Sequence, residues 1–185
     1  MSNNIRLILL IIFIFITHSV QAQSLARLDL KKGYYNLKLG DDISKWEPQS
    51  IQFISSGSET AYFYKGQDIS DLYGHSVKKV ILNFYNKKLS SIILDFGIWD
   101  APEEGKYTNL DKSLDRLNDV IDILKSAYGS PSDVSNDTNA EKVAVYWEAK
   151  SKYILINLNY LGVRKGSRVT IEFGNTKSTV NSLIK

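Results

Sequence analysis

Residues 80–96, Val-Ile-Leu-Asn-Phe-Tyr-Asn-Lys-Lys-Leu-Ser-Ser-Ile-Ile-Leu-Asp-Phe, are the stretch that decides the fold. Apolar residues alternate with polar or mixed residues on both sides of a turn at Asn86-Lys87: Val80, Leu82 and Phe84 before it, and Ile92, Leu94 and Phe96 after it. A period of two places successive side chains on opposite faces of a strand. The stretch therefore predicts an antiparallel hairpin with one face on a core and the other towards water.

The same alternation recurs on both sides of this hairpin. Towards the C-terminus it predicts three strands, marked by Val143, Val145 and Trp147, by Ile154, Ile156 and Leu158, and by Val169, Ile171 and Phe173. Towards the N-terminus it predicts strands at Tyr34–Leu39, Ser50–Ser55 and Thr60–Tyr64. Between the first two of these, Asp41 or Asp42 can cap a short helix over Ser44–Trp46 that Pro48 ends. The composition of Asp133–Asn139 indicates a polar loop.

One long amphipathic helix is predicted from about Thr108 to Tyr128. Its apolar residues, spaced alternately by four and three, are Leu110, Leu114, Leu117, Ile121, Leu124 and Tyr128. This spacing draws a single stripe down one side of a helix. Thr108 with Asp111 resembles a capping box, Gly129 suits the C-terminal cap, and Pro131 blocks continuation.

These elements predict an α+β fold. We expect an antiparallel sheet built from hairpins, with the long helix and a short helix packed on one face. The hairpin at 80–96 can be laid over residues 143–160, so that Phe84 matches Trp147 and Phe96 matches Tyr160. This echo suggests two helix-plus-hairpin halves, about residues 34–99 and 106–174, within a single domain. The alternative is that any two amphipathic hairpins look alike.

This layout resembles the small exported α+β domains of the β-lactamase-inhibitor-protein-like type. The resemblance lies in Leu37-Lys-Leu-Gly40 before the capped turn, in Leu124-Lys-Ser-Ala-Tyr-Gly-Ser-Pro131, and in the hairpins, and it covers Tyr35 to Phe173. It implies short helices packed on one face of an antiparallel sheet. Because members of such families mostly bind other proteins or serve in envelope assembly, it also implies a binding role, by analogy only.

The first 22 residues have the three zones of a secretory signal peptide. A short polar stretch with Arg6 leads into the apolar run Leu7–Ile16, and a polar segment ends at Val20-Gln21-Ala22. Ten apolar residues are too few for the roughly 20 that a membrane-spanning helix needs, so a cleaved signal is favoured over a membrane anchor. We therefore predict a signal peptide at 1–22, a single domain at 23–185, export to a periplasm or the medium, and no stable membrane anchor after cleavage.

Composition excludes several classes of chemistry. The 23 Lys and Arg residues nearly balance the 20 Asp and Glu residues, which argues against a nucleic-acid partner. The chain has no cysteine, so disulfides, thiolate metal sites and iron–sulfur clusters are excluded. After cleavage of the signal, His75 is the one histidine left, and a histidine-based metal site needs partners. We expect no cofactor and no metal.

Candidate catalytic groups are few. His75 could act with Asp68 or Asp71 as an orienting group, but no serine lies in a Gly-x-Ser-x-Gly motif and a turn residue is the commoner role. A glycosidase-like pair of carboxylates could come from Asp95 with Asp100, or from Glu103 with Glu104. Asp95 falls on the face opposite Ile92 and Leu94, where we expect it to meet water or the sheet edge. No catalytic residue is therefore assigned.

Tyrosines in the strands are the strongest lead to function. Alternation places Phe63 on the face of its strand opposite Tyr62 and Tyr64. The tyrosines of the later strands cannot all share one face. The candidate binding residues are Tyr62, Tyr64, Tyr146, Tyr153 and Tyr160. Tyrosines on the outer face of a sheet suit protein recognition or carbohydrate stacking, although they can equally form a second buried layer. The leading hypothesis is an exported, non-enzymatic module that binds another protein, of inhibitor, immunity or envelope-assembly type. The alternative is a carboxylate-dependent hydrolase acting on cell-wall or extracellular glycan.

Overall fold

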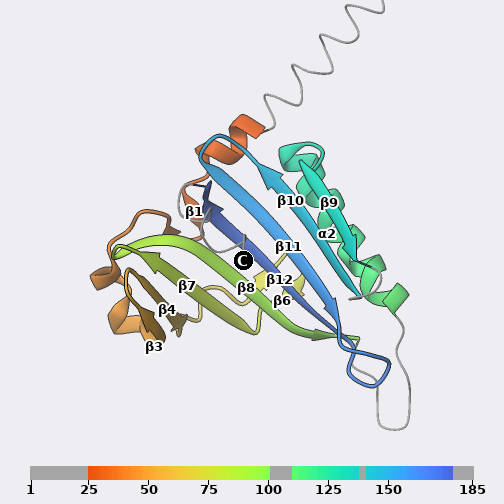
Figure 1. The fold of residues 1–185 in the computed structure, drawn as a ribbon, viewed down its shortest axis with the longest axis horizontal. Helices are drawn as coiled ribbons and strands as arrows, with labels where there is room; N and C mark the ends of the chain where they lie inside the picture. The colour runs from red at the N-terminus through yellow and green to blue at the C-terminus, as the bar shows by residue number, and fades with distance from the viewer. Residues whose placement is uncertain (1–24, 101–109, 138–140, 177–185) are drawn as a thin grey trace, which may run out of the picture.

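The computed structural model describes residues 25–100, 110–137 and 141–176 and is built around one eight-stranded antiparallel sheet (Figure 1). The strands follow the order β3-β4-β7-β8-β12-β11-β10-β9. Their bounds are β3 Ser50–Ser56, β4 Glu59–Tyr64, β7 Lys79–Tyr85, β8 Lys88–Trp99, β9 Asp133–Asp137, β10 Lys142–Glu148, β11 Lys152–Tyr160 and β12 Ser167–Asn175. This arrangement confirms the predicted α+β class and its antiparallel sheet.

The sheet consists of two runs of four neighbouring strands. β3, β4, β7 and β8 follow one another in space as in sequence, and β9 to β12 do the same from the other edge. The antiparallel pairing of β8 with β12 joins the runs. The two hairpins of the sequence echo therefore occupy different positions, because β7–β8 reaches this junction while β10–β11 lies one strand further out.

The long helix α2, Leu110–Tyr128, confirms the period read from the sequence. Its buried side chains include Leu117, Ile121 and Leu124, as the apolar stripe predicts. Gly129 has a φ of 82° and its backbone N–H donates to the carbonyl of Lys125 at 2.8 Å, so it ends the helix in the left-handed conformation that glycine adopts readily. The expected capping residue Thr108 lies outside the described residues.

The core lies between α2 and the face of the sheet that the alternation predicted. Residues such as Leu94, Ile156 and Ile171 are fully buried in one cluster with Leu117 and Leu124 of α2. The side chain of Trp147 crosses from β10 to the helix end, where its Nε1–H donates to the carbonyl of Gly129 at 2.9 Å.

The N-terminal part of the domain departs from the prediction. The expected strand Tyr34–Leu39 is instead a tight hairpin of two short strands, β1 Gly33–Tyr34 and β2 Leu37–Lys38. Tyr35, with a φ of 52°, turns the chain between them. Residues 25–30 before the hairpin are helical, and Leu28 is buried in the core.

Three other local expectations need correction. Asp42 caps a short 3-10 helix, η1 Ile43–Lys45, as expected, but Pro48 lies inside a second one, η2 Glu47–Gln49, because proline is compatible with a first helical turn. Of the segment expected to be a polar loop, Asp133–Asp137 forms the edge strand β9, and residues 138 and 139 lie outside the described residues. The small hairpin of β5 Asp71–Leu72 and β6 His75–Ser76 was not predicted.

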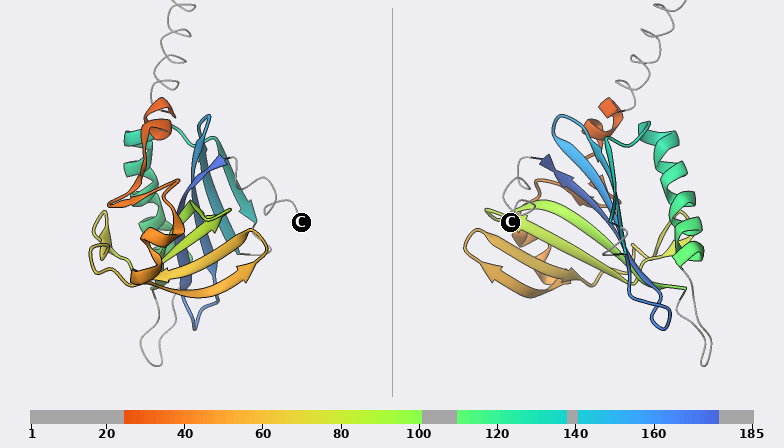
Figure 2. Two further views of the ribbon diagram at one scale, coloured as in Figure 1. Left: turned by 90° about the vertical axis from the view of Figure 1, so that its left-hand side faces the viewer. Right: turned by 45° about the vertical axis from the view of Figure 1, so that its right-hand side comes forward.

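The described elements outside the sheet gather on one side of it. In the left view of Figure 2, α2, the N-terminal segment and the β5–β6 hairpin all lie on the same side, and no described element covers the other. We call this other side the open face. In the described ranges, no helix is long and apolar enough to cross a membrane.

Candidate functional site

The open face presents a row of mostly apolar side chains across the sheet, with Glu172 between Ile93 and Leu155. Strand pairing places one residue of each strand side by side in this row, which we call the central row. From β3 to β9 its members are Ile51, Phe63, Ile81, Ile93, Glu172, Leu155, Tyr146 and Asp133. Neighbours in register across a sheet share a face and contact one another. Six of the eight are therefore large apolar or aromatic residues on the side of the sheet that faces away from α2.

Most of the central row is partly accessible to solvent. Ile51 is 50% exposed, and the five other apolar and aromatic members are half-buried. Beside Ile51 on the edge strand, Phe53 stacks on Phe63 with ring centroids 4.0 Å apart and is itself 41% exposed. Contiguous apolar surface of this kind is uncommon where a protein meets only water.

A second row lies next to the central row, and its members other than Gly174 form the floor of a shallow pocket. Ala61, Asn83, Ser91, Gly174 and Tyr153 follow one another in register from β4 to β11. The pocket has a volume of about 230 Å³ and is also lined by Ile54, Glu59, Tyr85 and Glu172. We call it the acidic pocket because the charged residues lining it, Glu59 and Glu172, are both carboxylates.

Tyr153 fixes one wall of the acidic pocket. Its ring lies so close to Gly174 that a Cβ atom there would be 2.4 Å from the ring carbons. Its hydroxyl donates to Oε1 of Glu172 at 2.6 Å, and the whole residue is only 2% exposed. The ring of Tyr146 lies 5.8 Å away, and burial together with Glu148 and Glu172 raises the pKa of Tyr146. Glu172 is thus held in place at the centre of the open face.

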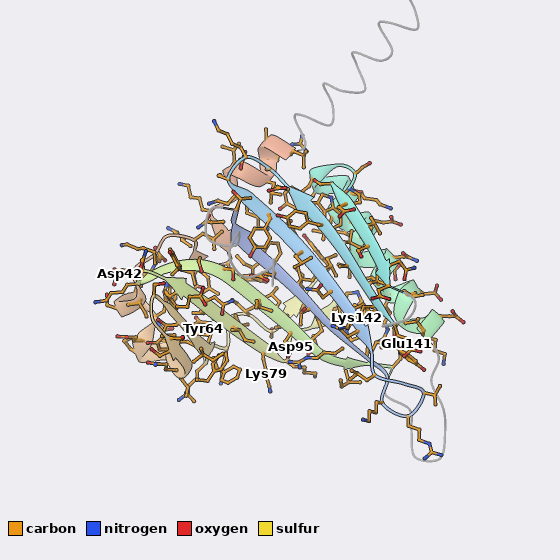
Figure 3. All side chains as sticks on the ribbon, in the orientation of Figure 1. Asp42, Tyr64, Lys79, Asp95, Glu141 and Lys142 are labelled. Carbon is orange, nitrogen blue, oxygen red and sulfur yellow. The ribbon has the colours of Figure 1, made fainter. Side chains whose placement is uncertain are left out.

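Asp95 also lies on the open face, but it is buried and ion-paired. It is 3% exposed, its Oδ2 accepts from Nη2 of Arg168 at 2.7 Å, and its Oδ1 accepts from the N–H of Gly97 at 2.8 Å. Lys79 lies opposite it in register, and both are labelled in Figure 3. The expectation that Asp95 meets water is wrong, because Arg168 from β12 covers it.

Two of the five candidate tyrosines lie in the core. Tyr62 is 5% and Tyr64 is 8% exposed, both on the face that α2 covers, so for these two rings the buried alternative holds and the outer-face alternative does not. Each hydroxyl is satisfied near the surface, Tyr62 by Glu47 at 3.1 Å and Tyr64 by Asp68 at 3.0 Å. Strand pairing places Tyr62 and Tyr64 beside the buried Leu82 and Val80 of β7, so both rings face the core. Phe63 lies between them in sequence and therefore faces the open side.

The other three tyrosines are divided between the two faces. Tyr146 and Tyr153 belong to the open face through their places in the two rows. Tyr160, at the end of β11, is half-buried and has the phase of the inward-facing Ile156 and Leu158. The structure thus brings two of the five candidate residues together, beside Glu172.

The candidate catalytic groups do not converge in the described part of the chain. Asp100 accepts from the hydroxyl of Ser113 at 3.0 Å and pairs with Arg116 of α2 at 3.5 Å, on the side of the sheet opposite Asp95. His75 packs on the ring of Trp99 at 5.1 Å, whereas Asp68 and Asp71 accept hydrogen bonds from Tyr64 and from the backbone of Gly74. Glu103 and Glu104 lie outside the described residues. Among the described residues, no group of three potential metal ligands is close enough to hold an ion.

Comparison with known proteins adds no further lead: no family model, curated protein or solved structure matches the chain.

The central row was missed in the sequence, although a signal for it exists. Ile81, Ile93 and Leu155 each stand at the polar phase of an alternating strand, next to apolar residues of the inward phase. One such residue needs no explanation, because single apolar residues are common on surfaces. Three of them in three strands of one sheet indicate a second apolar face.

Proposed function

We propose that the chain is an exported, non-enzymatic protein-binding module that holds its partner against the open face of the sheet. The observation that carries this proposal is the central row, whose apolar side chains stay partly exposed on a face that no described element covers. Burial of such a row against a partner removes apolar surface from water, which is the main driving force of protein association. Export rests on the N-terminal sequence pattern alone.

The chemistry of the face favours a partner that is itself a protein. Phe63, Leu155 and Tyr146 offer apolar and aromatic area, and the exposed side chains of Lys79 and Arg168 add polar groups on the same face. An apolar centre with a polar rim is the usual anatomy of a protein–protein interface. The partner is accordingly expected to present an apolar patch of its own.

The hydrolase alternative gains no support from the geometry. Its two described carboxylates, Asp95 and Asp100, lie on opposite sides of the sheet and each is paired with an arginine. A retaining or inverting glycosidase needs its two carboxyl groups on either side of one substrate bond. We therefore make no second proposal.

Affinity capture with matched variants tests the proposed function. Tagged protein from Gln23 to Lys185 keeps every described element and is used to capture proteins from the envelope and secreted fractions of the source cells. We expect one stoichiometric partner to be retained by the wild type and lost with Ile81→Lys, which places a charge in the central row. Ile123→Lys is the control, because Ile123 is 38% exposed on α2, away from the open face.

The pair of variants makes the outcome decisive. Circular dichroism must first show that both remain folded. Retention of the same partner by Ile81→Lys and by Ile123→Lys with equal yield contradicts the proposal, as does a folded bait that retains no protein.

A further inference from the structure

The acidic pocket holds a half-buried carboxylate, Glu172, at the centre of the open face. Asp95, a second carboxylate on the open face, does not line this pocket. Its charge is neutralised by Arg168, whose Nη2 lies 2.7 Å from Oδ2 of Asp95. Glu172 is half-buried, and none of the described lysines, arginines or histidines forms an ion pair with it. Its one hydrogen-bond donor among the described residues is the uncharged hydroxyl of Tyr153. Partial burial of a carboxylate without a cation is unfavourable, and a cation brought by a ligand relieves it.

Two polar residues on the floor, Asn83 and Ser91, line the same pocket as Glu172. Nδ2 of Asn83 donates to Oγ of Ser91 at 2.9 Å. The side-chain oxygen of Asn83 can therefore accept a hydrogen bond from a ligand. Ser91 is 4% exposed and keeps acceptor capacity on its oxygen. These oxygens and the carboxylate of Glu172 all accept hydrogen bonds, so the pocket is matched to a donor-rich group.

The size and the walls of the pocket define the rest of the ligand. A volume of about 230 Å³ is smaller than that of pockets for drug-sized molecules, which begin at roughly 300 Å³, and it suits a single long side chain. Ile54 and Ala61 offer apolar contact for an alkyl stem, and the exposed ring of Tyr85 offers a surface for a planar cation. A guanidinium group combines a planar cation with five donors, which an ammonium group does not.

We propose that the acidic pocket receives one arginine side chain of the partner protein, with its guanidinium on Glu172 and Asn83 and its stem over Ile54 and Ala61. This inference rests on the proposed function, because it assigns the partner's anchor residue on the same face. Arginine is among the residues that most often dominate the binding energy of an interface, especially in a central pocket surrounded by apolar contacts. The central row supplies those contacts next to Glu172.

A titration followed by NMR tests the pocket without knowledge of the partner. The probe is the blocked tripeptide acetyl-Gly-Arg-Gly-amide, and its matched control replaces arginine by citrulline, which keeps the shape and removes the charge. We expect saturable shifts of the backbone amides of Asn83, Ser91 and Glu172 with the arginine peptide. Binding is expected to weaken roughly tenfold with citrulline and with Glu172→Gln, because each removes a charge-assisted hydrogen bond.

A neighbouring carboxylate provides the control variant. Glu148 lies beside Tyr153 in register but does not line the pocket, so Glu148→Gln changes the net charge equally and is expected to leave the response intact. The inference is overturned if the arginine peptide gives no saturable shift, if citrulline binds equally well, or if the two Glu→Gln variants behave alike. Partner capture that depends on Ile81 together with a silent arginine titration refutes this inference alone and leaves the proposed function standing.

Discussion

At the scale of the residue, the contact between Tyr153 and Gly174 shapes the centre of the open face. The two residues are opposite one another on β11 and β12, and the tyrosine ring fills the space that a side chain at position 174 would need. The φ of Gly174 is not positive. The glycine is therefore needed because the tyrosine ring approaches closely, and not for its backbone freedom. Through this contact the hydroxyl of Tyr153 reaches Glu172.

Gly174→Ala tests this contact. The new methyl group must displace the ring or the strand, so we expect the free energy of unfolding to fall by roughly 1–3 kcal/mol, as for other overpacked sites. Urea unfolding followed by tryptophan fluorescence measures the change. In a Tyr153→Ala background the same substitution is expected to cost much less, since the ring is gone; an equal cost in both backgrounds would show that the contact is not the cause.

At the scale of the element, the N-terminal segment is tied to the turn between β10 and β11. Asp29 accepts hydrogen bonds from the backbone N–H of Ser151 at 2.7 Å and of Lys150 at 3.1 Å, and from the hydroxyl of Ser151 at 2.9 Å. Burial alone would raise the pKa of Asp29, but these hydrogen bonds outweigh it and lower the pKa below the usual 3.8. The segment that carries Leu28 into the core is therefore held by a carboxylate whose ionised form these hydrogen bonds favour.

The pH dependence of stability follows from this lowered pKa. A carboxyl group with a lower pKa in the folded state stabilises the protein fully above the unfolded value, and this contribution is lost as the pH falls through the folded value. Asp29→Asn is expected to lower the free energy of unfolding by about 1 kcal/mol at pH 7 and by progressively less below about pH 4. Urea unfolding at a series of pH values measures both; a difference that stays constant down to pH 2 would contradict the assigned role.

The elements predicted correctly from the sequence are those with a long, regular period. In α2, the spacing of Leu117, Ile121 and Leu124 places all three on one side of the helix, which identifies the buried side. In β7 and β8, the alternation of apolar residues identifies the buried face in the same way. β9 was missed because all five of its residues are exposed and only its backbone pairing with β10 makes it a strand. Such an edge strand has no apolar pattern to detect.

The candidate site was predictable only in part, for a related reason. Alternation shows that Tyr62 and Phe63 lie on opposite faces of β4, but it does not say which face the helix covers. That choice depends on the pairing of strands far apart in sequence, as in the contact of β8 with β12. Because a tyrosine ring is stable in either environment, its identity could not decide between them.

At the scale of the whole molecule, the junction of β8 with β12 turns two four-stranded runs into one surface. The central row crosses this junction at Ile93 and Glu172, and the ion pair of Asp95 with Arg168 crosses it nearby. The open face can therefore present one continuous surface only while the two runs stay in register. The bulge between Arg168 and Thr170 lies beside the ion pair and marks the point where the register shifts.

Arg168→Ala is expected to weaken this junction. It leaves Asp95 buried with the N–H of Gly97 as its donor, and we expect a loss of roughly 1–3 kcal/mol in the free energy of unfolding. Lys125→Ala is the control, because it removes the exposed ion pair with Asp122, which contributes little. Chemical unfolding of the two variants decides the matter: equal, small losses would mean that the ion pair does not hold the junction.

The central claim is that a partner binds the open face, and side-chain footprinting of the complex tests it most directly. The protein is labelled by hydroxyl radicals alone and with its captured partner, and the modified residues are read by mass spectrometry. We predict that Phe63, Tyr146 and Leu155 become protected, whereas Ile123 on α2 and Tyr73 beside β6 are labelled as before. Protection of Ile123 and Tyr73 with unchanged labelling of the central row would place the partner on the other side of the molecule and contradict the claim.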